Sequence, residues 1–128
     1  MSECDIVLRI SLTRENFSEA LLLIEADALD VSWRAGEKRL GGAIHEDSGA
    51  NVILAEGVDL VAKDGELESI MQRNAGMILA LTRLGAKMEL DFGVYGEGLV
   101  TSVELSKPVL EQLAVLGIPV RVSFYLSD

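Results

Sequence analysis

The same short pattern occurs twice in this chain, at residues 81–92 and again at residues 113–124. Each copy reads as the end of an amphipathic helix, then a glycine, then a run in which apolar and polar side chains alternate. Glycine commonly ends helices because it enters the left-handed conformation without steric cost. Alternation is typical of a strand with one buried and one solvated face. The repeat therefore predicts helices laid against one face of a mostly antiparallel sheet.

The other segments extend this prediction to the order β-α-β-β-α-β-β-α-β. The expected strands are residues 5–12, 31–33, 51–55, 87–92, 99–105 and 118–126, and the expected helices are residues 17–28, 65–84 and 106–116. Residues 36–49 are rich in glycine and charge and predict a loop, and residues 95–98 predict a hairpin turn. In the last strand we expect Val120, Val122 and Phe124 to face the core.

Each helix must bury one stripe and each clear strand one face, and one sheet with all its helices on one side satisfies both demands. We therefore expect an α+β two-layer sandwich, either ferredoxin-like or a related split β-α-β fold. The pattern does not predict the strand order. A length of 128 residues and an apolar content of 49% fit a single domain, residues 1–128, with a substantial core.

The charge balance is strongly acidic, with a formal net charge of −10. Such a surface repels phosphate backbones and anionic membranes, so we expect neither nucleic acid nor membrane as a partner. Solubility and attraction to a basic protein partner both remain open as reasons for the acidity. No run of residues is long and apolar enough for a membrane span, and the acidic start is unlike a secretory signal. We therefore expect a cytoplasmic protein.

The chain has one cysteine, Cys4, and one histidine, His45. A zinc site needs three or four protein ligands, and these two residues cannot supply them, so we expect no metal. The same shortage argues against cysteine–histidine and serine–histidine nucleophilic mechanisms. We predict no catalytic residue and no cofactor.

The first candidate binding site is Trp33 with Arg34 and Glu37. Tryptophan offers a large apolar surface, and arginine a planar fork that recognises carboxylates or stacks on aromatic rings. The alternative is that Trp33 fills the core while Arg34 and Glu37 pair at the surface.

The second candidate is the solvated face of the sheet, which no helix is expected to cover. Its polar residues are Arg9, Ser11, Glu89, Asp91, Arg121, Ser123 and Tyr125. Glu89 and Asp91 share this face because they lie two residues apart on one strand. General acid–base chemistry uses paired carboxylates, but cross-strand ion pairs are the more ordinary interpretation on a solvated face.

One short segment resembles the signature of a known family. This segment consists of Ser32, Trp33, Arg34, Ala35, Gly36 and Glu37. They resemble the Ser-Trp-Arg-Lys-Gly-Glu signature of the bacterial family called domain of unknown function 4279. The resemblance continues through residues 84–86, 95–98, 104–106 and 116–118. The family's second tryptophan has no counterpart at residues 48–52 here. The resemblance brings no established activity, and some small bacterial families of this kind are toxin-immunity proteins.

Two functional hypotheses follow. The first is a small acidic binding or interaction protein without catalysis, of a regulatory or immunity type, whose partner is a protein, basic in charge, or a second copy of the chain. The second is a small-molecule-binding or enzymatic domain that uses the open sheet face together with Trp33 and Arg34.

Overall fold

The computed structural model describes residues 3–38, 42, 45–59, 65–97 and 104–127. Its strands are β1 (Glu3–Leu12), β2 (Leu29–Trp33), β3 (Ser48–Asp59), β4 (Lys87–Glu97) and β5 (Val120–Ser127). Its helices are α1 (Arg14–Leu22), a short 3-10 turn η1 (Ala26–Ala28), α2 (Glu66–Arg83) and α3 (Lys107–Leu116).

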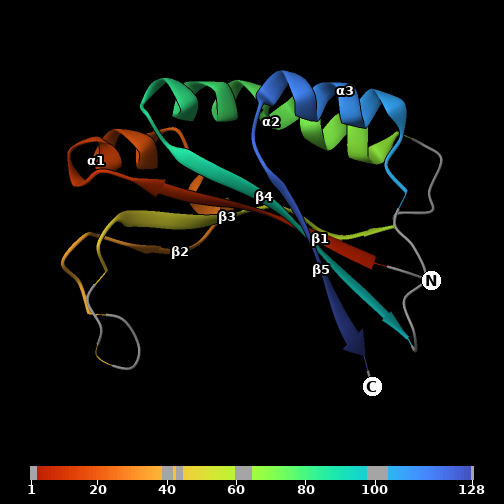
Figure 1. The fold of residues 1–128 in the computed structure, drawn as a ribbon, viewed down its shortest axis with the longest axis horizontal. Helices are drawn as coiled ribbons and strands as arrows, with labels where there is room; N and C mark the ends of the chain where they lie inside the picture. Colours follow the sequence, from red (N-terminus) through yellow and green to blue (C-terminus); the bar gives the residue numbers. More distant parts are fainter. Residues whose placement is uncertain (1–2, 39–41, 43–44, 60–64, 98–103, 128) are drawn as a thin grey trace.

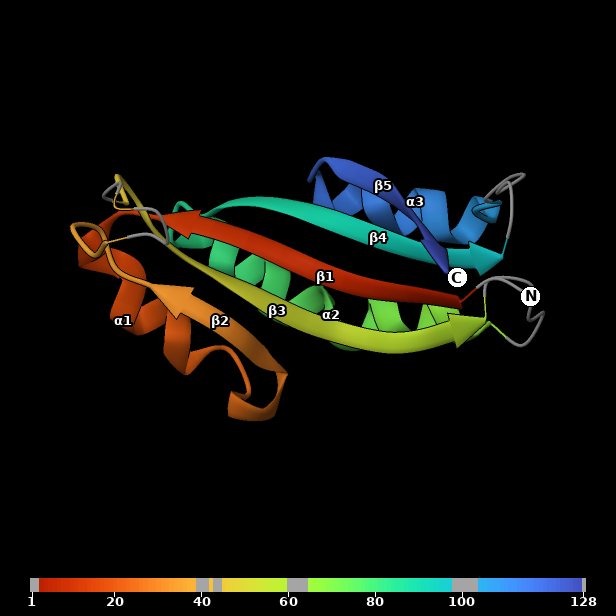
Figure 2. The same ribbon diagram turned by 90° about the horizontal axis from the view of Figure 1, so that it is seen from below.

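The strands form one open sheet in the order β2-β3-β1-β4-β5. All neighbouring pairs are antiparallel except β4 and β5, which run parallel. The segments from β1 to β4 follow the split β-α-β order, in which each helix connects two strands separated by a third. The α3–β5 unit adds one further strand beside β4. Figures 1 and 2 show the helices gathered on one face of the sheet, with the other face uncovered. The predicted α+β two-layer class is confirmed.

Both copies of the repeated pattern form the predicted helix, glycine and strand. After α2 the chain turns at Gly85, whose φ is 84°, and the Ala86 amide donates to the carbonyl of Leu81 at 3.1 Å. After α3 it turns at Gly117, whose φ is 66°. These left-handed glycines stop each helix and return the chain to the sheet.

The core lies between the sheet and the helices. Along β1 every second residue from Cys4 to Leu12 is buried, as the alternation predicts. Ile6, Leu8 and Phe92 are fully buried, and they belong to the same cluster as the inward residues of all three α-helices. The opposite residues of β1 and β4 therefore project from the uncovered face.

Three expectations about the chain path are wrong. Tyr95, Gly96 and Glu97 continue β4 instead of forming a turn, because the strand stays paired to β1 as far as Tyr95 and to β5 as far as Glu97. Of the strand expected at 99–105, residues 104–105 do not belong to a strand, and the others lie outside the described residues. β3 is far longer than the predicted segment 51–55, since it pairs with β1 along most of its length.

The expectation that the last strand buries its apolar face is also wrong. Val120, Val122 and Phe124 are 39%, 36% and 53% exposed. By register they lie beside Leu90, Phe92 and Val94, on the helix side of the sheet. They remain exposed because α3 packs against α2, and β5 runs away from the helices toward its end (Figure 1).

Candidate functional site

The uncovered face of the sheet brings together the seven polar residues of the second candidate, which come from β1, β4 and β5. Arg9 of β1 lies directly opposite Glu89 of β4, and Asp91 lies beside Arg121 of β5. Tyr125 lies further along β5, beside Tyr95. Figure 2 views the molecule from this side, with the helices behind the sheet. We call this surface the open face.

Asp91 is the most buried charged group of the open face, only 4% exposed. The Arg9 guanidinium donates to its Oδ2 atom, at 2.9 Å from Nη2 and 3.2 Å from Nε. The Ser123 hydroxyl donates to its other oxygen at 3.0 Å. This carboxylate therefore joins β1, β4 and β5, and its two oxygens are both engaged.

The second ion pair joins Arg121 of β5 to Glu89 of β4, with 3.0 Å between Nε and Oε1. Its side chains are more exposed than Asp91, so water screens the attraction and the pair contributes little to stability. Both pairs are the cross-strand ion pairs expected of a solvated sheet face, and they leave neither carboxylate free for acid–base chemistry.

Trp33 lies at the other side of the open face, on β2. It is half-buried and does not belong to the core cluster. Its ring lies against the backbone of Gly49: a Cβ atom at residue 49 would come within 2.5 Å of the indole Cζ2 atom. The His45 imidazole is stacked on the indole, with 5.1 Å between centroids and 19° between planes. The indole is thus held in place by contacts with both Gly49 and His45.

Arg34 and Glu37 do not join Trp33. Since neighbouring residues of an extended segment point to opposite sides, Arg34 reaches the helix side, where its Cζ atom lies 5.1 Å from the centre of the Phe17 ring. Glu37 is exposed, and its carbonyl accepts a hydrogen bond from the His45 amide at 2.9 Å. Among the described residues no ion pair joins Arg34 to Glu37.

A hollow of about 420 Å³ opens between Trp33 and β4 on the open face. Its lining residues are Arg9, Ile10, Ser11, Trp33, Asn51, Lys87, Met88 and Glu89. The strand order creates this hollow, because β3 and β1 separate Trp33 from Lys87 and contribute only the small residues Gly49 and Ser11 to the row between them. In the described part of the chain, Lys87 has no ion-pair partner.

Two tyrosines cover the far end of the open face. The rings of Tyr95 and Tyr125 stack with 5.0 Å between centroids and 20° between planes. The Tyr125 ring lies over Gly93, where a Cβ atom would approach it to 3.2 Å. Burial, and then the charge and hydrogen bond of Asp5, raise the pKa of the Tyr95 hydroxyl. Sequence reasoning missed Tyr95 because the neighbouring glycines suggested a turn, although the alternation beyond Phe92 continued.

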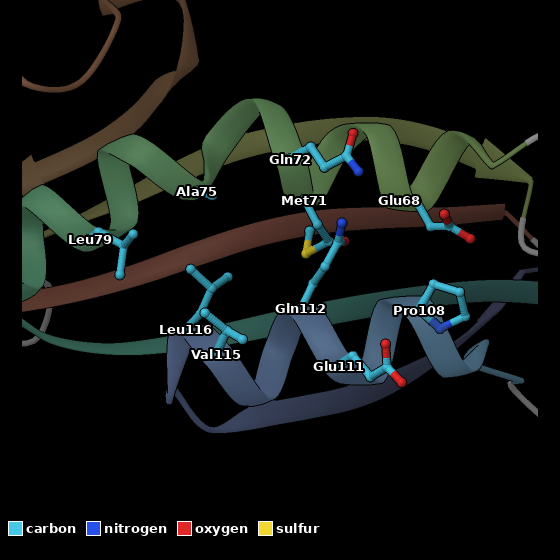
Figure 3. A pocket seen from close by; sticks show the side chains of 10 residues that line it. All are labelled: Glu68, Met71, Gln72, Ala75, Leu79, Pro108, Glu111, Gln112, Val115 and Leu116. Atoms are coloured by element: carbon cyan, nitrogen blue, oxygen red, sulfur yellow. The ribbon is translucent and has the colours of Figure 1, made fainter.

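A second hollow, of about 350 Å³, lies between α2 and α3 on the outer surface of the helix layer. Figure 3 shows its walls, formed by Met71 and Ala75 on one side and by Val115 and Leu116 on the other. Within the described chain, the buried Oε1 atom of Gln112 has no hydrogen-bond partner. Glu68 lies opposite Pro108 at one end of the groove (Figure 3).

Two features are absent from the described residues. No three histidine, cysteine, aspartate or glutamate side chains gather in a way that could hold a metal ion. No helix there has the length and apolar character to cross a membrane. The fold and the open face therefore define an α+β protein with an aromatic and charged sheet surface. In comparisons with protein-family models, curated proteins and solved structures, nothing matches this chain.

Proposed function

We propose that this protein is a binding protein without catalysis, which holds a protein partner against its open face. The supporting observation is the half-buried Trp33 ring beside a hollow of about 420 Å³, on a sheet surface that the chain's own helices leave uncovered. Tryptophan is enriched among the residues that contribute most to protein interfaces.

The rigidity of Trp33 favours this role. The ring contacts the Gly49 backbone and stacks with His45, so the indole loses little freedom when a partner binds beside it. Lys87 offers a hydrogen-bond donor on the opposite side of the hollow, and Ser11 offers one between Lys87 and Trp33. Binding is the better account than catalysis, because the two carboxylates, Glu89 and Asp91, are both held in ion pairs.

The net charge of −10 favours a partner of basic charge, because opposite charges speed the encounter of two proteins. An immunity protein that neutralises a basic toxin is the particular role we propose. Membership of the family called domain of unknown function 4279, and a cytoplasmic location, remain predictions.

The experiment uses Trp33 as its own probe, because it is the only tryptophan of the chain. The wild type and Trp33→Ala are immobilised in parallel, proteins retained by the wild type are identified, and each is titrated against the free protein with tryptophan fluorescence. In the wild type we expect saturable binding that quenches or shifts the Trp33 emission. Trp33→Ala has no tryptophan, so the affinities of both proteins are measured by isothermal titration calorimetry, and we expect a loss of affinity of about 10-fold or more in the variant.

The matched control is Leu22→Ala, which removes an exposed side chain from α1, away from the open face. It should bind like the wild type. Circular dichroism shows whether Trp33→Ala keeps its fold. Equal binding by a folded Trp33→Ala would refute the proposed contact surface, and affinity that does not fall with added salt would refute the basic partner.

A small-molecule ligand is the second candidate, since the hollow falls within the usual range of ligand sites. Native mass spectrometry distinguishes the two candidates. A small molecule bound to the protein, whose release changes the Trp33 fluorescence, favours the ligand. A bound protein chain favours the first proposal.

A further inference from the structure

β5 is the edge of the sheet on one side. It pairs with β4 through one edge, and no strand among the described residues pairs with its other edge. The Leu90 amide donates to the Pro119 carbonyl across the β4–β5 pair at 2.9 Å. Because backbone groups of successive residues alternate between the two edges of a strand, the outward amides and carbonyls are those of Val120, Val122 and Phe124.

The same three residues expose apolar side chains on the helix side of the sheet, as described above. Pro108, Gln112 and Val115 of α3 face the groove with α2, so Leu110 lies on the flank of α3 that faces away from α2, and it is 51% exposed. An apolar strip therefore accompanies a row of free backbone hydrogen-bonding groups.

Edge strands of monomeric proteins are commonly protected by lysine, proline, bulges or short length. β2, at the opposite edge, is short and carries the exposed Asp30. From Val120 to Tyr125, β5 has a regular register and a single charge, Arg121, which is already paired with Glu89 of the same chain. The β5 edge thus lacks the features that prevent a strand from pairing with another chain.

We propose that two copies of this chain pair antiparallel through β5, about a two-fold axis at Ser123, so that their sheets become continuous. In this register Val122 of each copy lies opposite Phe124 of the other copy, so this apolar pair occurs twice on the helix side of the sheet. On the open face Arg121 lies opposite Tyr125, where a guanidinium and an aromatic ring attract each other. No like charges face each other, as a self-complementary two-fold interface requires.

The second copy is the occupant that this strand fits best, because its own sequence satisfies both faces of the pairing. The dimer also leaves the Trp33 side of the open face free, since β2 and β5 are opposite edges of the sheet. The two proposals are therefore independent. Salt distinguishes them: contact between two chains of net charge −10 strengthens as salt screens their repulsion, whereas binding of a basic partner weakens.

The first test is sedimentation equilibrium of the full chain, with Phe124→Lys as the variant and Leu22→Lys as the matched control. Both substitutions place a lysine at an exposed apolar position, but Leu22 lies on α1, far from β5. We expect a dimer for the wild type and for Leu22→Lys, and a dissociation constant raised about 100-fold in Phe124→Lys.

The second test is covalent. Residues opposite each other on the two-fold axis approach closely, so Ser123→Cys should form a disulfide between two copies under mild oxidation, whereas Ser32→Cys on β2 should not. Cys4 is buried and does not compete. A strictly monomeric wild type, or a dimer that is insensitive to Phe124→Lys and does not cross-link through residue 123, would overturn the proposal.

Discussion

The Trp33 ring lies against the backbone of β3 because residue 49 has no side chain. The Ile10 carbonyl lies 2.7 Å from where a Cβ would stand, and the indole is as close on another side. A backbone carbonyl and an indole ring cannot move aside for an added Cβ atom as easily as the end of a flexible side chain would. The absence of one methyl group thus decides where the aromatic surface of the open face lies.

Gly49→Ala should therefore destabilise the protein by about 1–3 kcal/mol and change the Trp33 emission, because the ring must leave its position. The matched control is Gly76→Ala in α2, where a Cβ meets nothing within 4 Å. That change should stabilise the protein by about 0.5–1 kcal/mol, since alanine is the better helix former. Urea unfolding followed by fluorescence measures both. A Gly49→Ala protein as stable as the wild type would contradict the close approach.

Cys4 provides a prediction about pH. Burial, and then the charges of Asp5 and Asp91, raise the pKa of its thiol from 9.0 to about 12. The folded pKa lies above the unfolded one, so the stability it contributes is complete below pH 9 and is lost as the pH rises toward about 12. Urea unfolding across this range should show a steeper loss of stability in the wild type than in Cys4→Ala. Equal slopes in the two proteins would contradict the assignment.

At the scale of the elements, the Asp91 carboxylate fastens β5 to the rest of the sheet. β5 has hydrogen-bonded strand pairing on one edge only, and α3 lies mainly against α2. The hydrogen bond from Ser123 to Asp91 adds a side-chain contact to the backbone pairing of β5 with β4, and Arg9 holds the same carboxylate from β1.

Asp91→Ala should lower the free energy of unfolding by about 1–3 kcal/mol, because it leaves the Arg9 guanidinium and the Ser123 hydroxyl without their hydrogen-bond acceptor. Glu89→Ala is the matched control on the same strand and face, and it should cost less than about 1 kcal/mol because its pair is more exposed. Amide hydrogen exchange should quicken in β5 more than in β1 when Asp91 is replaced. Uniform exchange across the sheet would show that Asp91 does not fasten β5.

At the scale of the whole molecule, the net charge of −10 means that the excess acidic side chains repel one another in the folded state. Raising the salt concentration from low to physiological levels should raise the melting temperature, because screening weakens this repulsion more than it weakens the two cross-strand ion pairs. Measurements at two protein concentrations separate this effect from dimer formation, since only the dimer's contribution depends on concentration. A melting temperature that falls with salt would mean that the ion pairs dominate.

Sequence patterns among neighbouring residues predicted those parts of the fold that depend on neighbouring residues alone. The two helix ends at Gly85 and Gly117 depend on the conformational freedom of one residue, and the buried side of β1 depends on a two-residue period. The hairpin turn predicted at residues 95–98 was wrong because the prediction considered only neighbouring residues. Glycines near Tyr95 suggested a turn, but pairing with β1 and β5 keeps these residues extended, and Gly93 makes room for the Tyr125 ring.

The sequence by itself determined which side chains share a face, because alternation along a strand is a property of neighbouring residues. Only the tertiary structure decided which strands lie side by side, and so which faces meet: Trp33 shares a hollow with Arg9 and Lys87, while Arg34 does not. It also decided that Val122 and Phe124 stay exposed, because a period cannot state how far a helix reaches over the sheet. Contacts between distant segments depend on packing of the whole chain, and no local pattern encodes them.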